Sequence, residues 1–182
     1  MWGPCFVGAN RIAEVEHLGS LQSLTVLSLQ SNRLTSARGL ETLTSLKELY
    51  LSENKLLTLE GLPTSCPSLT ILDVANNQIR ELSGVTAYPA LEDVWANTNR
   101  LTQLPETLAE LVKLPALTTV YLHYNHWAAA AAGGAEGEQE HRPVGWSVHY
   151  PPKPEELLSK AEYKRQVLEA LPKLEQLDDT YR

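Results

Sequence analysis

The chain has 182 residues, of which 43% are hydrophobic and 20% are charged, and its formal net charge is −7. This composition is typical of a folded globular protein and excludes a disordered one. The negative charge argues against a nucleic-acid backbone or an anionic membrane surface as the main partner.

The same composition indicates a reducing compartment. The two cysteines, Cys5 and Cys66, lie far apart and lack the spacing of a metal site, so a disulfide framework is not expected. No apolar run approaches the length that a membrane-spanning helix needs. The first ten residues, MWGPCFVGAN, lack a basic region followed by a long apolar stretch, so we expect no signal peptide. A nuclear or cytoplasmic protein fits these features.

The segment 24–34, LTVLSLQSNRL, combines two periodicities. Leu27 and Leu29 alternate and therefore share one face of a short strand, and Leu24 and Leu34 return to the same interior. Asn32 stands where the chain bends, and its side-chain amide can pair with backbone groups left free by the bend. The pattern L-x-x-L-x-L-x-x-N-x-L is the core of a leucine-rich repeat, which cannot bury its apolar face without neighbours.

The turn asparagine recurs at a nearly constant interval, which lies within the range expected for leucine-rich repeats. It stands at Asn10, Asn32, Asn54, Asn77, Asn99 and Asn125, and the last interval is the longest. The residues three, five and eight positions before each asparagine can all face a core. The sequence therefore predicts about six leucine-rich repeats over residues 1–127.

We expect an α/β solenoid with a parallel concave sheet and a convex side of 3-10 turns or short helices. The convex part of the fifth repeat, PETLAELVKLP, carries Leu108, Leu111 and Leu114 at helical spacing between Pro105 and Pro115. A true helix is expected there.

Two segments follow the repeats. Residues 128–154 are low in complexity and are interpreted as a poorly ordered insertion. Residues 155–182 carry a capping box, Ser159 with Glu162, and an apolar stripe that ends at Pro172. This segment is predicted to be a helical cap over the exposed end of the sheet. At the other end, either Trp2 caps the first repeat or the chain is shortened there, and we favour the second.

Residues between the core positions of each strand should face the concave surface. Four positions before the asparagines stand Phe6, Ser28, Tyr50, Asp73, Trp95 and Tyr121, and the column six positions before includes Glu48 and Asp93. Five strand spacings make a ridge of about 24 Å. The aromatics could merely stack on one another in the sheet. Exposed aromatic side chains beside carboxylates are more typical of a protein-binding face.

The repeats resemble one family closely through the segments LTILDVANNQI, ALEDVWANTNRL and LTTVYLHYN, together with the C-terminal YKRQVLEALPKLEQLDDTY. That family is the leucine-rich-repeat regulatory subunit of protein phosphatase 1. The resemblance implies that the concave face grips the phosphatase catalytic subunit. Matching strands would place the contacts at Phe6, Asp73, Asp93, Trp95 and Tyr121. Family members carry more repeats, and an insertion before the cap is unusual.

Other chemistry is less well supported. Asp73 and Asp93 on adjacent strands could act as an acid–base pair, four histidines (His123, His126, His141, His149) could suggest a metal, and Cys66 could be a reactive thiol. An open sheet does not exclude water, and no ligand spacing repeats. We therefore predict a non-enzymatic protein with no cofactor and no metal.

The predicted function is a regulatory subunit, monomeric by itself, that docks the protein phosphatase 1 catalytic subunit. The predicted partner-binding residues are Phe6, Glu48, Tyr50, Asp73, Asp93, Trp95 and Tyr121. The alternative is a scaffold that uses the same repeats for a cytoskeletal or ciliary protein.

Overall fold

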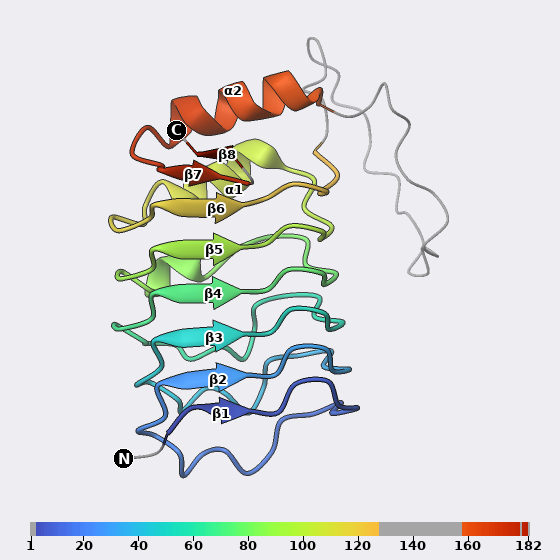
Figure 1. Cartoon of the computed structure of the whole chain (residues 1–182), viewed down its shortest axis with the longest axis vertical. Helices are drawn as coiled ribbons and strands as arrows, with labels where there is room; N and C mark the ends of the chain where they lie inside the picture. The colour runs from blue at the N-terminus through green and yellow to red at the C-terminus, as the bar shows by residue number, and fades with distance from the viewer. Residues whose placement is uncertain (1–2, 128–157, 179, 182) are drawn as a thin grey trace, which may run out of the picture.

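The computed structural model describes residues 3–127, 158–178 and 180–181, and its strands form one sheet in chain order (Figure 1). The repeats supply the first six strands: β1 (Cys5–Phe6), β2 (Val26–Ser28), β3 (Glu48–Tyr50), β4 (Ile71–Asp73), β5 (Asp93–Trp95) and β6 (Thr119–Tyr121). Each of them pairs in parallel with the next. The predicted parallel solenoid is confirmed.

One hydrophobic core runs the length of the stack, behind the strands. Its central column is Leu27, Leu49, Leu72, Val94 and Val120, each fully buried and each opposite the next in the strand register. Apolar residues from the convex turns also pack there: Leu34, Leu40, Leu43, Leu56, Leu59, Leu62, Ile79, Leu82 and Val85. Ile12 and Leu18 of the first repeat lie at its margin. Burial of this apolar surface is the main force that joins one repeat to the next.

The turn asparagines link consecutive repeats. The side-chain oxygen of Asn54 accepts a hydrogen bond from the backbone N–H of Leu34 in the preceding turn, at 2.9 Å. Its amide nitrogen donates to the carbonyls of Leu29 and Leu51, both at 3.0 Å. Asn32, Asn77, Asn99 and Asn125 bridge to the preceding turn in the same way. Each of these five asparagines therefore pairs with backbone groups in the bend of its own repeat and fixes the register of the preceding repeat.

The convex side of the described repeats contains fewer 3-10 turns and short helices than the sequence predicted. Within the described repeats it holds a 3-10 turn, η1 (Val85–Ala87), and one α-helix, α1 (Leu104–Leu111), and the other repeats cross it in turns. These turns approach closely: a Cβ on Gly61, whose φ is +93°, would overlap the backbone of the preceding repeat at Arg38. Helix α1 is confirmed where the longer repeat predicted it, with Leu108 and Leu111 buried and Pro105 in its first turn.

Helix α2 (Lys160–Ala170) lies over the C-terminal end of the stack (Figure 1). It begins at Ser159, whose hydroxyl accepts the backbone N–H of Glu162 at 3.2 Å, as the predicted capping box requires. Strand β7 (Gln176–Leu177) then pairs in parallel with β6, and β8 (Thr180–Tyr181) pairs antiparallel with β7. The predicted insertion, residues 128–154, lies outside the described residues. Within the described parts of the chain, no helix is long and apolar enough to cross a membrane.

Candidate protein-binding face

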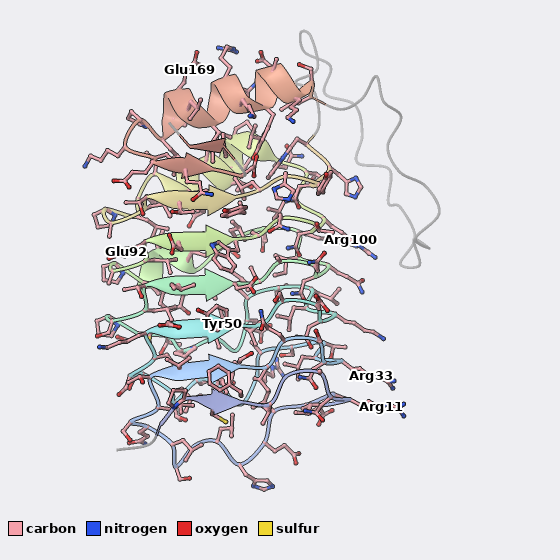
Figure 2. All side chains as sticks on the ribbon, viewed as in Figure 1. Arg11, Arg33, Tyr50, Glu92, Arg100 and Glu169 are labelled. Carbon is pink, nitrogen blue, oxygen red and sulfur yellow. The ribbon has the colours of Figure 1, made fainter. Side chains whose placement is uncertain are left out.

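The strand register brings the predicted concave column together. Phe6 lies opposite Ser28, Ser28 opposite Tyr50, Tyr50 opposite Asp73, Asp73 opposite Trp95, and Trp95 opposite Tyr121. Tyr50 lies near the middle of the stack (Figure 2). Since every strand is parallel and in register, these side chains form one row along the sheet.

Four rings form a continuous aromatic row: Tyr50, Trp95, Tyr121 and His123. Their centroids are 6.4, 5.9 and 6.2 Å apart in that order, with interplanar angles of 60°, 70° and 67°. These edge-type contacts lie in the favourable range for aromatic pairs. Tyr50, Trp95 and Tyr121, the members of this row that the sequence predicted as contacts, remain partly exposed. The indole N–H of Trp95 is buried without an acceptor among the described residues. An unpaired buried donor lowers stability, and the indole N–H of Trp127 is in the same state.

Asp73 lies beneath this row instead of projecting from it. Only 2% of the residue is exposed, although its position in the strand predicts an outward direction. Tyr50 and Trp95 stand on either side of it, two strand spacings or about 9.6 Å apart. Their ring centroids are only 6.4 Å apart, so the two rings lean toward each other across the strand that carries Asp73. The predicted outward direction of Asp73 is therefore correct, but its predicted exposure to solvent is wrong.

The carboxylate of Asp73 is occupied by neighbours within the protein. The side-chain amide of Gln30 donates to one oxygen, and the backbone N–H of Ala75 donates to the other, both at 3.0 Å. Burial raises the pKa of Asp73, while hydrogen bonds from Ser52, Ala75 and Gln30 act in the opposite direction. Asp93 lies opposite Ile71 in the register, at a different level from Asp73. The acid–base pair considered from the sequence is therefore not assembled across the strands.

Glu48 and Asp93 are partly exposed and flank the aromatic row, two positions before Tyr50 and Trp95 on the same strands. The hydroxyl of Tyr50 donates to Glu48 at 2.9 Å. Burial and the neighbouring Glu48 raise the pKa of Tyr50 to about 12, so its hydroxyl stays protonated at physiological pH. The face therefore presents neutral rings beside negative charge.

Phe6 stands apart from the other predicted site residues. It is 69% exposed on the first strand, and Ser28 separates it from Tyr50. Tyr50, Trp95, Tyr121, Glu48 and Asp93 form one cluster. Phe6 lies at the end of the sheet, and Asp73 lies below the cluster.

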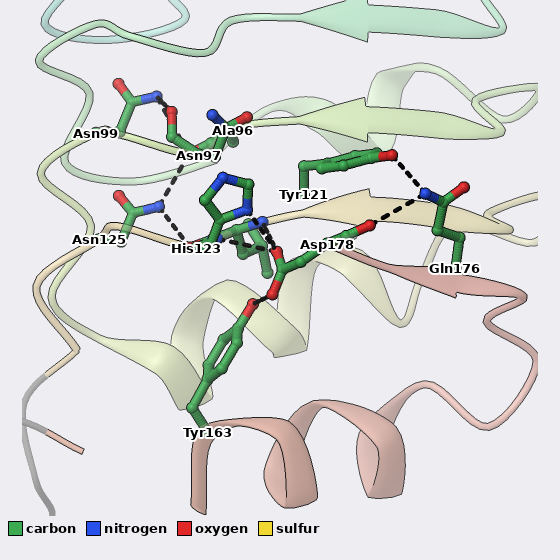
Figure 3. A network of polar contacts seen from close by, with 10 residues as sticks. Ala96, Asn97, Asn99, Tyr121, His123, Asn125, Tyr163, Gln176 and Asp178 are labelled. Carbon is green, nitrogen blue, oxygen red and sulfur yellow. Dashed lines mark hydrogen bonds and ion pairs between the residues drawn. The ribbon is translucent and has the colours of Figure 1, made fainter. Parts of the chain in front are cut away.

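The cap holds the end of the aromatic row through Asp178 (Figure 3). One oxygen of Asp178 accepts the backbone N–H groups of Leu122 and His123, at 2.8 and 3.0 Å, and lies 3.1 Å from His123 Nδ1. Its other oxygen accepts the hydroxyl of Tyr163 at 3.1 Å. In the preceding repeat the equivalent backbone N–H, that of Ala96, donates to the carbonyl of Tyr121 on the next strand. Beyond the end of β7, the side-chain carboxylate of Asp178 thus replaces the main-chain carbonyl that accepts this hydrogen bond in the preceding repeat.

Two further contacts join the cap to the last repeat. The side-chain amide of Gln176 donates to the hydroxyl of Tyr121, which orients the last predicted anchor (Figure 3). Trp127 stacks on Tyr163 of α2, with centroids 6.1 Å apart and ring planes 11° apart. Sequence reasoning missed these residues because they are separated along the chain, although the aspartate that follows LEQL resembles a turn residue after a strand.

The sequence also suggested a reactive Cys66 and a histidine metal site, of which His141 and His149 lie outside the described residues. Cys66 is fully buried, its thiol lies 3.1 Å from the carbonyl of Leu46, and burial raises its pKa, so it is a core residue. Among the described residues, no three His, Cys, Asp or Glu side chains are placed to hold a metal ion. A pocket of about 540 Å³ lies between the turns 58–64 and 81–88, away from the aromatic row.

Comparisons with known proteins agree with this architecture. A family profile for leucine-rich repeats, in two copies, matches residues 22–64 and 44–87. A search of curated proteins finds no match.

Three solved structures share the fold. An internalin (InlF) of Listeria monocytogenes has 20% identity and a TM-score of 0.66, over 95% of this chain and 40% of that one. A leucine-rich-repeat protein of Leptospira interrogans has 25% identity and a TM-score of 0.63, over 92% and 34%. The functional domain of InlJ from Listeria monocytogenes has 23% identity and a TM-score of 0.54, over 64% and 24%.

The chain thus spans less than half of the length of each of these proteins. Their similarity concerns the scaffold, an open curved sheet suited to binding other proteins. The profile match shows that residues 22–87 contain leucine-rich repeats, and the solved structures share the solenoid fold.

Proposed function

We propose that the protein is a regulatory subunit that binds the catalytic subunit of a type 1 serine/threonine phosphatase on its concave face. The partner follows from the resemblance of the strands VWANTN and TTVYLHYN and of the C-terminal cap to that regulatory family. Binding requires no chemistry from this chain. The docked catalytic subunit would have its activity, maturation or access to other subunits altered by contact with the sheet.

The aromatic row beside Glu48 and Asp93 is the observation that carries the proposal. Trp and Tyr are the residues most enriched at the energetic centres of protein interfaces. Trp95 and Tyr121 are partly exposed and held rigid, Trp95 by ring contacts on both sides and Tyr121 by Trp95 and Gln176. Rigid anchors lose little conformational entropy when a partner covers them. The adjacent carboxylates favour a basic surface on the partner.

A calorimetric titration of the full chain with the purified phosphatase catalytic subunit tests the proposal. Tight binding is expected for the parent protein. Trp95→Ala and Tyr121→Ala should each weaken binding by about 2 kcal/mol or more, which corresponds to about thirty-fold in Kd.

A matched control removes an exposed apolar side chain outside the strands. Leu57 is 50% exposed, so Leu57→Ala should bind like the parent. The phosphatase assignment is wrong if the parent does not bind while its thermal unfolding shows it to be folded. The assignment of the face is wrong if the parent binds and both ring variants match Leu57→Ala.

A further inference from the structure

A second surface lies along the edge of the solenoid where the strands end and the convex turns begin. The residue directly after each turn asparagine forms this edge, and these residues are Arg11, Arg33, Lys55, Gln78, Arg100 and His126. We call the four permanent cations, Arg11, Arg33, Lys55 and Arg100, the basic edge. Four cations in one column are unexpected in a chain with a net charge of −7.

Backbone hydrogen bonds fix the spacing of the basic edge. The N–H of Arg33 donates to the carbonyl of Ile12, that of Lys55 to Leu34, and that of Arg100 to Ile79, each at 2.8 Å. Successive positions along this edge are therefore about 4.8 Å apart, and the four steps from Arg11 to Arg100 span about 19 Å. Arg11, Arg33 and Arg100 project from the same side of the stack, and Glu92 lies on the opposite side (Figure 2).

The basic edge has no ion-pair partner among the described residues. Within residues 3–127 and 158–178, none of its four cations forms an ion pair, whereas Arg38, Lys113 and Arg165 each do. Glu53, two residues before Lys55, contributes one negative charge near the edge, and its carboxylate accepts the hydroxyl of Ser31 at 2.7 Å. Like charges on neighbouring strands repel and lower stability. Repulsion among the four cations therefore lowers the stability of the free protein, and a ligand of opposite charge would remove this repulsion.

We propose that the basic edge binds an acidic segment of a partner protein in an extended conformation. A length of about 19 Å matches about six residues of extended chain. The planar guanidinium of arginine pairs well with carboxylates, and three of the four cations are arginines. The net charge of −7 would repel a long nucleic acid, so a short acidic segment fits the charge distribution better. This inference does not depend on the identity of the partner bound by the aromatic row.

The test is a ¹⁵N NMR titration of the full chain with an end-blocked hexaglutamate peptide at about 10 mM salt, where the Debye length is about 30 Å. The backbone amides of Arg33, Lys55 and Arg100 should shift, and the indole N–H of Trp95 should not. Raising the salt to about 150 mM should weaken the binding.

Two variants with equal charge separate a defined site from general attraction. The first replaces the basic edge, Arg11→Gln, Arg33→Gln, Lys55→Gln and Arg100→Gln, and should lose at least tenfold in affinity. The second replaces four other exposed cations, Arg38→Gln, Lys113→Gln, Lys160→Gln and Lys173→Gln, and should stay within about twofold of the parent. All eight side chains lie away from the core, so both variants should fold, as circular dichroism would establish.

Three results would overturn the proposal. In the first, the parent shows no shifts at low salt. In the second, both variants lose affinity equally, which means that the attraction is non-specific. In the third, a single-stranded oligothymidylate of about twelve nucleotides binds the edge more tightly than the peptide does, which would assign the edge to nucleic acid.

Discussion

Tyr50 and Trp95 come within 6.4 Å of each other, centroid to centroid, across the strand that carries Asp73. Their own strands, β3 and β5, are not adjacent, so the contact exists only because both rings lean toward the short side chain between them. The outer surface of the row is therefore aromatic where the sequence places a carboxylate. The carboxylate itself becomes a buried group with a raised pKa.

The first prediction concerns the pH dependence of stability. Because burial raises the pKa of Asp73, the folded protein binds a proton at this site more readily than the unfolded chain does. The stability that this contributes is fully present below the unfolded pKa, near 4, and is lost as the pH rises through the folded pKa. Asp73→Asn has no titratable group at this position, so this loss of stability with rising pH should disappear. The free energy of unfolding of the variant, relative to the parent, should therefore increase from pH 3 to pH 7 in urea titrations.

Asp93→Asn is the control, since it removes the same charge from a partly exposed position of the neighbouring strand. The difference in the free energy of unfolding between Asp73→Asn and the parent could be independent of pH, or could match that of Asp93→Asn. Either result would show that the burial of Asp73 has no energetic consequence.

The second prediction concerns the asparagine ladder. Asn54→Ala removes the acceptor for the N–H of Leu34 and the donor to the carbonyls of Leu29 and Leu51. The buried N–H of Leu34 loses its acceptor, while the two carbonyls still accept from Asn32 and Asn77. The free energy of unfolding should fall by about 1–3 kcal/mol. Asn10→Ala should have a much smaller effect, because Asn10 is exposed and bonds only within its own turn. Equal losses in urea unfolding would show that the bridge between repeats is unimportant.

The third prediction concerns the end of the sheet. Asp178→Ala removes the acceptor for the N–H groups of Leu122 and His123 and for the hydroxyl of Tyr163. We expect a loss of about 1–3 kcal/mol and faster hydrogen exchange at Leu122 and His123. Asp178→Asn keeps one oxygen acceptor and suits the φ of +51° at this position, so it should retain most of the stability. Unchanged exchange in Asp178→Ala would contradict the replacement of a main-chain carbonyl by this carboxylate.

The fourth prediction compares two glycines with nearly equal φ. Gly84→Ala places a Cβ in open space at a φ of +92°, so only backbone strain of about 1–2 kcal/mol is expected. Gly61→Ala has similar strain at +93°, and its Cβ would also lie 2.6 Å from the carbonyl carbon of Ala37. Thermal unfolding should therefore show a larger loss for Gly61→Ala. A loss equal to that of Gly84→Ala would mean that the turns can separate without cost.

Much of the scaffold follows from local patterns in the sequence. Alternating Leu27 and Leu29, with Asn32 just after them, predict a strand and a bend, and repetition at a nearly constant interval predicts that copies stack in register. The longer fifth repeat predicts α1, and Ser159 with Glu162 predicts the start of α2. These features depend on contacts within a short stretch of chain or between equivalent positions, which a sequence displays directly.

The exposure of the site residues depended on tertiary structure. A strand determines which way Asp73 points, but the side chains packed around it, among them Gln30 and Ser52, determine whether it reaches solvent. In the same way, Asp178 and Gln176 reach β6 only because the cap folds back on it. The sequence by itself therefore determined the repeat, the core and the direction of each concave side chain. Only the packed structure decided which of them remain available, because exposure is a property of neighbours brought together by folding.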